Sequence, residues 1–259
     1  MTFPNSFSSS TAVTPATLRR SIVSKVLCVL SVGILMTGCS SQPDDSTPAT
    51  SAADVKITDQ ELEIHGYIDE ATLTKIRALS TNYSFSRVRV NIEGGEPLAT
   101  MQLGYFIHRR QLDLVVDQYC LGACANYLFT AAKTKYLGPE SIVAWSNGAR
   151  SSSWTQQNQR FLFPGARFVA EQYLDSFLRR ENRFFERIGV DQAVTEYGYA
   201  QASGCSAPQQ GFYYTIPELL RFGIANVVPA HGDWRTAFDH YPDSFCRVDL
   251  SNEIDVIRT

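Results

Sequence analysis

The apolar positions between residues 55 and 146 change period repeatedly, which divides this part of the chain into alternating strands and helices. Apolar side chains at every second position predict strands, and those at every third or fourth position predict helices. The predicted strands cover residues 55–57, 61–68, 88–92, 112–116, 134–137 and 142–145. The predicted helices cover residues 70–80, capped by Asp69, and 97–111, and a further helix starts near Gly122.

This order of elements predicts an α/β fold with a mostly parallel sheet and right-handed crossovers. The first two strands are expected to form a hairpin. The run at 112–116 is almost continuously apolar, which predicts a strand covered on both faces of the sheet.

The chain beyond residue 160 is mainly helical. Pro164 opens a long amphipathic helix that Gly189 closes, with aromatic and aliphatic side chains on one broad face. The opposite side carries Arg179, Arg180, Arg183 and Arg187. A solvated helix face is the simpler interpretation of these arginines, and an anionic partner is the alternative. A strand over 212–215, a short helix over 217–221 and a final strand over 224–228 follow.

The first 38 residues have the layout of a secretory signal. Three basic residues precede an apolar stretch over 26–36, which is short for a membrane span. The segment ends in Gly38 and Cys39 and resembles the lipobox of bacterial lipoproteins, in which the cysteine is acylated and becomes the new N-terminus. Met36 departs from the usual leucine of that motif, and an ordinary signal peptide with a chance cysteine is the alternative. Ser40 in place of an aspartate implies the outer membrane, facing the periplasm.

Three parts of the chain follow from composition. Residues 1–38 form the signal peptide, 39–54 a polar lipidated tether, and 55–259 a single domain with its core at about 61–228 and a C-terminal extension over 229–259. The signal holds three of the 23 basic side chains and none of the 26 acidic ones, so the remainder has a net charge of −6. This charge argues against a nucleic-acid partner.

Four cysteines remain in the domain of a protein that the signal directs to an oxidising compartment. They are Cys120, Cys124, Cys205 and Cys246. Three pairings exist, and local spacing favours Cys120 with Cys124 and Cys205 with Cys246, although a crossed pairing stays open. A zinc site is the competing interpretation, but the only close pair has CxxxC spacing, so no metal is expected.

The ordered set of elements resembles the superfamily of the Clp protease proteolytic subunit and the crotonases over about 61–228. That order is strand, Gly-Gly turn, helix, strand, small-residue elbow, helix, strand, proline and strand. The likeness is greatest to exported relatives that carry a Cys-x-Ser-x-Cys elbow, and the segment 214–225 resembles their closing element. The resemblance implies repeated β-β-α units, extended by the long amphipathic helix and by a disulfide-tied C-terminal segment.

The resemblance also assigns positions to a hydrolytic site. In such peptidases the elbow serine attacks the carbonyl, a histidine activates the serine, and amides at the Gly-Gly turn bind the oxyanion. Here the turn is Gly94 and Gly95. The nucleophile position is Gly122, and the base position, seven residues after Pro139, is Ser146. Both reactive side chains are therefore missing.

Substitutes for the missing groups are hard to find in the sequence. Cys124 lies two residues past the elbow and suits a disulfide better than a nucleophile. Lys133 or Lys135 could act only with the serine that Gly122 replaces. The histidines are His65, His108, His231 and His240, and nothing in the sequence selects one of them as a base.

Two functions stay open. The favoured one is a non-catalytic, lipid-anchored periplasmic protein that binds a peptide or a protein partner or acts in assembly, without a cofactor. The rival is a serine- or cysteine-type hydrolase with a different nucleophile. A coenzyme A enzyme fits worst, because no basic cluster accompanies the Gly-Gly turn. Ring-forming relatives leave a homo-oligomer open as well.

Overall fold

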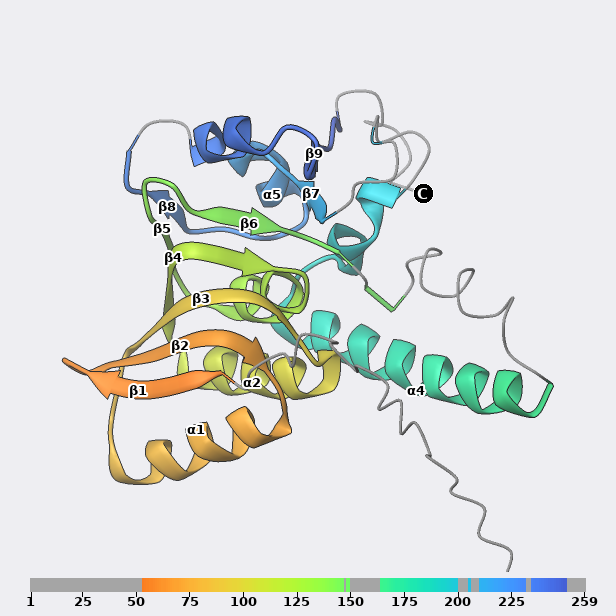
Figure 1. The fold of residues 1–259 in the computed structure, drawn as a ribbon, viewed down its shortest axis with the longest axis horizontal. Coiled ribbons are helices and arrows are strands. Elements are labelled where there is room, and N and C mark those ends of the chain that lie inside the picture. Colours follow the sequence, from red (N-terminus) through yellow and green to blue (C-terminus); the bar gives the residue numbers. More distant parts are fainter. Residues whose placement is uncertain are drawn as a thin grey trace, which may run out of the picture. The chain divides into compact units, whose positions relative to one another are not determined.

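The computed structural model describes residues 53–146, 148–149, 164–199, 205, 210–231 and 234–250. Residues Thr47–Thr259 form a compact unit of their own, and the buried core described there runs from Ala53 to Leu250 (Figure 1). The predicted signal, Cys39 and nearly all of the tether lie outside the described residues. Within the described ranges, no helix is long and apolar enough to cross a membrane.

A seven-stranded, mostly parallel sheet forms the centre of this unit, as the alternating pattern predicts. Its strands are β1 (Asp54–Thr58), β2 (Glu61–Ile68), β3 (Arg87–Gly95), β4 (Asp113–Leu121), β5 (Lys135–Leu137), β6 (Ile142–Ala144) and β8 (Val227–Pro229). They lie in the order β1-β2-β3-β4-β5-β8, and β6 pairs with β4. Only β1 is antiparallel, to β2, which confirms the predicted hairpin.

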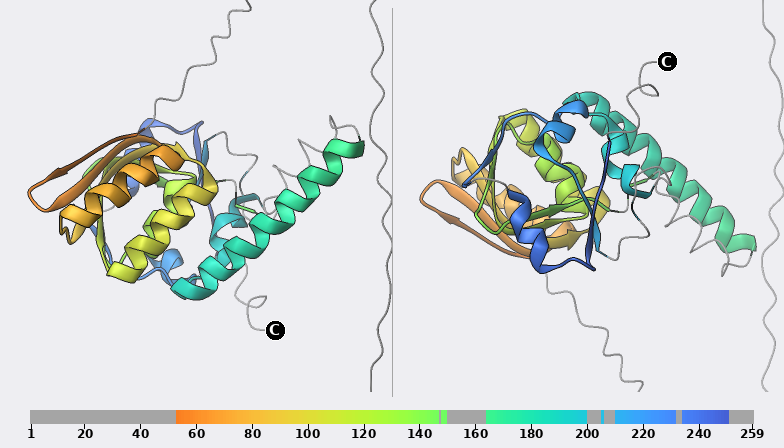
Figure 2. Two further views of the ribbon diagram at one scale, coloured as in Figure 1. Left: turned by 90° about the horizontal axis from the view of Figure 1, so that it is seen from below. Right: turned by 90° about the horizontal axis from the view of Figure 1, so that it is seen from above.

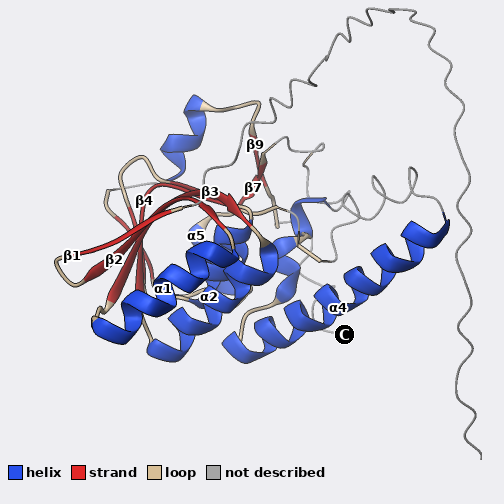
Figure 3. Cartoon of the chain, turned by 60° about the horizontal axis from the view of Figure 1, so that its bottom comes forward, coloured by secondary structure: helices blue, strands red, loops and turns tan. Residues whose placement is uncertain are grey.

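Helices α1 (Glu70–Asn82) and α2 (Pro97–Arg110) cover one face of the sheet (Figure 3). Asp69 caps α1 as predicted, since its carboxylate accepts a hydrogen bond of 2.7 Å from the Thr72 backbone N–H. The predicted long helix is α4 (Pro164–Ile188), and Gly189 follows it with φ of +71°. The shorter helices are η1 (Cys124–Phe129), η2 (Gln192–Thr195), η3 (Tyr197–Tyr199), α5 (Ile216–Arg221) and η5 (Trp234–His240).

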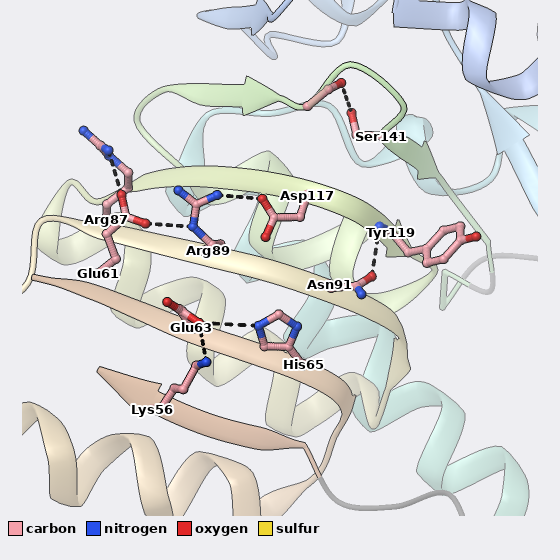
Figure 4. A network of polar contacts seen from close by, with 11 residues as sticks. Lys56, Glu61, Glu63, His65, Arg87, Arg89, Asn91, Asp117, Tyr119 and Ser141 are labelled. Atoms are coloured by element: carbon pink, nitrogen blue, oxygen red, sulfur yellow. Dashed lines mark hydrogen bonds and ion pairs between the residues drawn. The ribbon is translucent and has the colours of Figure 1, made fainter. Parts of the chain in front are cut away.

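The opposite face of the sheet is polar, and the prediction that residues 112–116 are covered on both faces is wrong. Side chains of β4 alternate between buried and partly exposed positions. The exposed face carries a row of ion pairs in which Glu61 accepts from Arg87 at 2.7 Å and from Arg89 at 2.8 Å (Figure 4). Arg89 also reaches Asp117 at 2.6 Å. Because Val115 shares this face with charged neighbours, apolar composition alone overstated its burial.

On the edge away from β3, strand β4 divides its pairing between two partners. Its first half, Leu114–Val116, lies beside β5, and its last residues, Tyr119–Leu121, lie beside β6. The strand ends at a sharp turn, where Gly122 has φ of +54° and donates its N–H to the Ala144 carbonyl at 2.9 Å. This turn leads directly into η1, a π-helix, and so creates the predicted elbow.

The C-terminal part contributes more structure than the sequence pattern indicates. Strands β7 (Gly211–Tyr213) and β9 (Phe245–Arg247) form a small parallel sheet, so the predicted strand at 224–228 is not the last one. The side chains of Trp234, Phe238, Phe245, Val248 and Leu250 are buried. Both favoured disulfides, Cys120–Cys124 and Cys205–Cys246, are present. The second disulfide joins Cys205 to Cys246 of β9.

Candidate functional site

A pocket of about 760 Å³ lies at the carboxyl ends of β3 and β4, which point toward α4 (Figure 1). The residues that line it include all four positions singled out in the sequence, namely Gly94, Gly95, Gly122 and Ser146. Five tyrosines also line it: Tyr67, Tyr119, Tyr127, Tyr173 and Tyr241. Pockets at the carboxyl ends of parallel strands are frequent ligand sites.

Gly122 and Ser146 face each other in this pocket. A Cβ atom added at Gly122 would lie 3.0 Å from the Ser146 Oγ atom. A side chain at position 122 would therefore touch position 146, which is the proximity that a nucleophile and its base require. As it stands, the pair offers one hydroxyl and no base.

The two glycines of the Gly-Gly turn differ in how closely they are packed. A Cβ at Gly95 would lie 2.5 Å from the Thr100 Oγ1 atom of α2 and 3.2 Å from the Ile68 carbonyl oxygen. A Cβ at Gly94 would meet only the ring of Tyr67, at 3.4 Å. Close packing between β3 and α2 is therefore enough to explain Gly95, independently of any oxyanion.

Asn126 is a pocket residue that the sequence analysis missed. Its Nδ2 donates to the Ser146 carbonyl at 2.7 Å, and its backbone N–H donates to the Gly122 carbonyl at 2.8 Å. The side chain is buried, and its Oδ1 atom has no hydrogen-bond partner within the described residues. Its position four residues after the elbow was the only available signal. Asn126 thus ties the start of η1 to the backbone of Ser146, and its Oδ1 atom is buried in the pocket wall.

Glu181 of α4 holds the wall behind the pocket together. Its Oε1 accepts from the Tyr127 hydroxyl at 2.7 Å, and its Oε2 accepts from the Gln192 Nε2 at 2.6 Å and the Ala149 N–H at 2.9 Å. Burial raises the pKa of Glu181, and these three donors oppose the rise. Burial and the adjacent carboxylate together raise the pKa of Tyr127 well above its usual value.

Tyr119 and Tyr241 lie at the pocket with their hydroxyl oxygens 3.4 Å apart. The hydrogen bond with Tyr241 raises the pKa of Tyr119, and burial and the charge of Glu93 act in the same direction. Glu93 is the one charged side chain in the described lining. The Tyr119 phenol is therefore a neutral hydrogen-bonding group at neutral pH.

The substitute catalytic groups do not reach this pocket. None of the four histidines, each of which is described, lines it. Cys124 is bonded to Cys120 and has no thiol to offer. Lys135 is buried, which lowers its pKa to about 8, but its Nζ donates to the Ala225 carbonyl at 2.9 Å beside β8. Lys133 is exposed and is not part of the lining.

Apart from Glu93, the described lining of the pocket offers a ligand uncharged groups. It contains no histidine, lysine or arginine, and the part of the chain with assigned positions contains no group of three potential metal ligands. A phosphate-bearing cofactor such as coenzyme A would find no described cation here. A ligand that donates hydrogen bonds or carries positive charge would meet Glu93, Asn126 and several aromatic faces.

No protein-family model and no curated protein matches the sequence. Among solved structures, the chain is similar to a putative enoyl-CoA hydratase from Streptomyces coelicolor A3(2), with 16% identity over 41% of this chain and a TM-score of 0.26. It spans about half of that protein, 51% of its length. A second similar structure is an enoyl-CoA hydratase/isomerase family member, with 12% identity over 74% of each chain and a TM-score of 0.37. Both similarities concern the fold alone.

Proposed function

We propose that this protein is a non-catalytic, lipid-anchored protein of the bacterial envelope that binds a peptide segment in the pocket at the ends of β3 and β4. The observation that carries the proposal is that Gly122 faces Ser146, since these are the two positions at which the resemblance places a nucleophile and a base. The pocket volume of about 760 Å³ lies within the roughly 300–1,000 Å³ typical of ligand pockets.

The ligand class follows from the polar groups of the lining. Glu93 is an exposed acidic acceptor, and the tyrosine rings present faces that attract cations. A peptide with exposed N–H groups and a lysine side chain matches this set. A peptide rich in carboxylates would place like charges beside Glu93.

Fluorescence polarisation with two labelled peptides tests this function on the Thr47–Thr259 unit. A lysine-containing peptide should bind more tightly than the same peptide with glutamate in place of lysine. Glu93→Gln should weaken binding of the lysine peptide on the order of fivefold, since one exposed ion pair contributes up to about 1 kcal/mol. Glu140→Gln, at an exposed carboxylate outside the pocket, is the matched control and should leave affinity unchanged. Equal binding of the two peptides would refute the assigned ligand class.

The absence of catalysis has its own test. The unmodified chain should neither cleave the bound peptide nor react with fluorophosphonate probes above background. The hydrolase hypothesis replaces ours if turnover persists through purification and disappears on a single substitution such as Ser146→Ala. A slow gain of probe labelling in Gly122→Ser with Ser146→His would support the assignment of these two positions.

Assembly is the remaining part of the proposal. The purified Thr47–Thr259 unit run on a sizing column distinguishes a monomer from a homo-oligomer. Peptide binding by a monomeric fraction would show that the pocket functions without assembly.

A further inference from the structure

A second cavity, of about 1,090 Å³, lies between helices α1, α2 and α4, away from the candidate site. We call it the arginine groove, because Arg77, Arg109, Arg110, Arg183 and Arg187 line it. Figure 2 shows α2 close to the C-terminal end of α4. Residues of both helices line the groove. Glu186 is the one acidic residue in the described lining.

The walls of the groove are firmly packed. Phe184, which lies between the two arginines of α4, is fully buried and packs edge-on against Tyr105 of α2 with ring centroids 4.9 Å apart. Gly104 permits this approach, since a Cβ there would lie 3.0 Å from the Phe184 ring. The backbone of α4 therefore holds Arg183 and Arg187 at a fixed place on the groove.

The positive charges of the groove are poorly compensated. Arg77 contacts Glu70 at 3.6 Å, but none of the other four arginines forms an ion pair with a described carboxylate. Arg183 and Arg187 line the groove together with Tyr105. Burial raises the pKa of Tyr105, and the charges of these two arginines act against that rise. A chain with an overall negative charge thus concentrates cations at one place.

Helix dipoles explain part of this arrangement. Arg109 and Arg110 occupy the last turn of α2, and Arg187 occupies the last turn of α4, where cations are favourable in any helix. Arg183 lies a turn earlier, and Arg77 comes from α1. Convergence of arginines from three helices on one groove exceeds what the dipoles account for.

We propose that the arginine groove binds the phosphate headgroup of an anionic lipid. Guanidinium groups match phosphate oxygens with two parallel hydrogen bonds, and several of them suit a charged headgroup. The groove is far larger than a free phosphate ion, and the half-buried rings of Tyr105 and Phe106 in its wall offer apolar contact to the rest of a lipid. This inference does not depend on the function of the other pocket.

Vesicle flotation tests the inference on the Thr47–Thr259 unit. The protein should float with phosphatidylcholine vesicles that contain phosphatidylglycerol, and not with phosphatidylcholine alone. Arg183→Gln with Arg187→Gln should weaken that binding on the order of tenfold or more. The matched control is Arg179→Gln with Arg180→Gln, which removes the same charge from exposed positions of the same helix outside the groove. Thermal unfolding of both variants should match the parent, since exposed side chains are changed.

Three outcomes would overturn the inference. Equal weakening by the two double variants would mean general attraction between charges and no site. Equal binding to vesicles without phosphatidylglycerol would show that the groove does not recognise the anionic headgroup. Binding of glycerol 3-phosphate or inorganic phosphate in solution, with no flotation, would assign the groove to a soluble anion.

Discussion

At the scale of residues, the buried carboxylate of Glu181 links more of the pocket wall than any motif residue does. It accepts from side chains of η1 and η2 and from the backbone at Ala149. A buried acceptor with three donors is costly to remove, because each donor is then left without a partner. The stability of the pocket wall should therefore depend on position 181.

Glu181→Ala should lower the free energy of unfolding by about 3 kcal/mol or more. Glu181→Gln should retain most of the stability, since the amide oxygen can serve two donors and the Tyr127 hydroxyl can rotate to accept.

The raised pKa of Glu181 gives the sign of the pH dependence of stability. The contribution of this raised pKa to the free energy of unfolding is fully present below the ordinary pKa of 4.5. That contribution is lost as pH rises through the pKa of the folded state. Urea unfolding at several pH values should show wild type losing stability relative to Glu181→Gln as pH rises; parallel curves would contradict this.

Gly95→Ala and Gly94→Ala form a second, matched test. The added methyl group at position 95 meets Thr100 and the Ile68 backbone, so that variant should lose about 2 kcal/mol of unfolding free energy. The methyl group at position 94 has ordinary contact distances and should cost far less. Chemical unfolding measures the loss of unfolding free energy in each variant. Similar losses in the two variants would show that the turn relaxes freely around the added methyl group.

Motif spacing predicted which residues meet in the pocket but not what surrounds them. Gly122 and Ser146 follow strands that are neighbours in a parallel sheet, so their proximity was predictable from element order. Glu181 accepts from residues 54 and 32 positions away in the chain. Nothing local in an arginine-rich helix distinguishes such a carboxylate from a solvated one.

At the scale of elements, strand β5 carries a buried cation between β4 and β8. Lys135 donates to the Ala225 carbonyl, and burial lowers its pKa from 10.5 to about 8. The unfolded chain therefore holds this proton more tightly than the folded one. The resulting penalty is present below pH 8 and is relieved as pH rises toward 10.5.

Lys135→Met should remove that penalty, worth about 3 kcal/mol, and should equal or exceed wild-type stability at pH 7. The rise in wild-type stability between about pH 8 and 10.5 should be absent from the variant. Lys133→Met, at an exposed position two residues earlier, is the control and should retain the rise. Calorimetric melting of both variants across this pH range measures the change of stability with pH. If stability rises with pH as steeply in Lys135→Met as in the wild type, the buried lysine is not the source of that rise.

Element prediction succeeded where periodicity extended over several turns or several alternations. The hairpin, both sheet-covering helices and α4 all have long patterns. Strand β9 and helix η5 have only three and seven residues, and their aromatic side chains are buried by distant partners such as Tyr213. Coverage of β4 was misjudged for a related reason, because Glu61, Arg87 and Arg89 of the charged row beside Val115 belong to β2 and β3.

At the scale of the whole molecule, Cys39 remains the predicted point of attachment to the membrane. Metabolic labelling with a fatty-acid analogue should tag the wild type and should fail on Cys39→Ser. Cys28→Ser, within the apolar part of the predicted signal, is the control and should still be labelled. Equal labelling of all three proteins, or of none, would exclude the lipobox interpretation.

Helix α4 forms a wall of both cavities, with Tyr173 and Phe177 on the pocket and Arg183 and Arg187 on the arginine groove. A shift of α4 along its axis would change the shape of both cavities at once. Binding at either cavity that favours one position of α4 must change affinity at the other by a common factor, whichever ligand arrives first. The shared helix therefore predicts thermodynamic linkage between the two cavities, and a peptide titration repeated with and without anionic vesicles tests for that coupling.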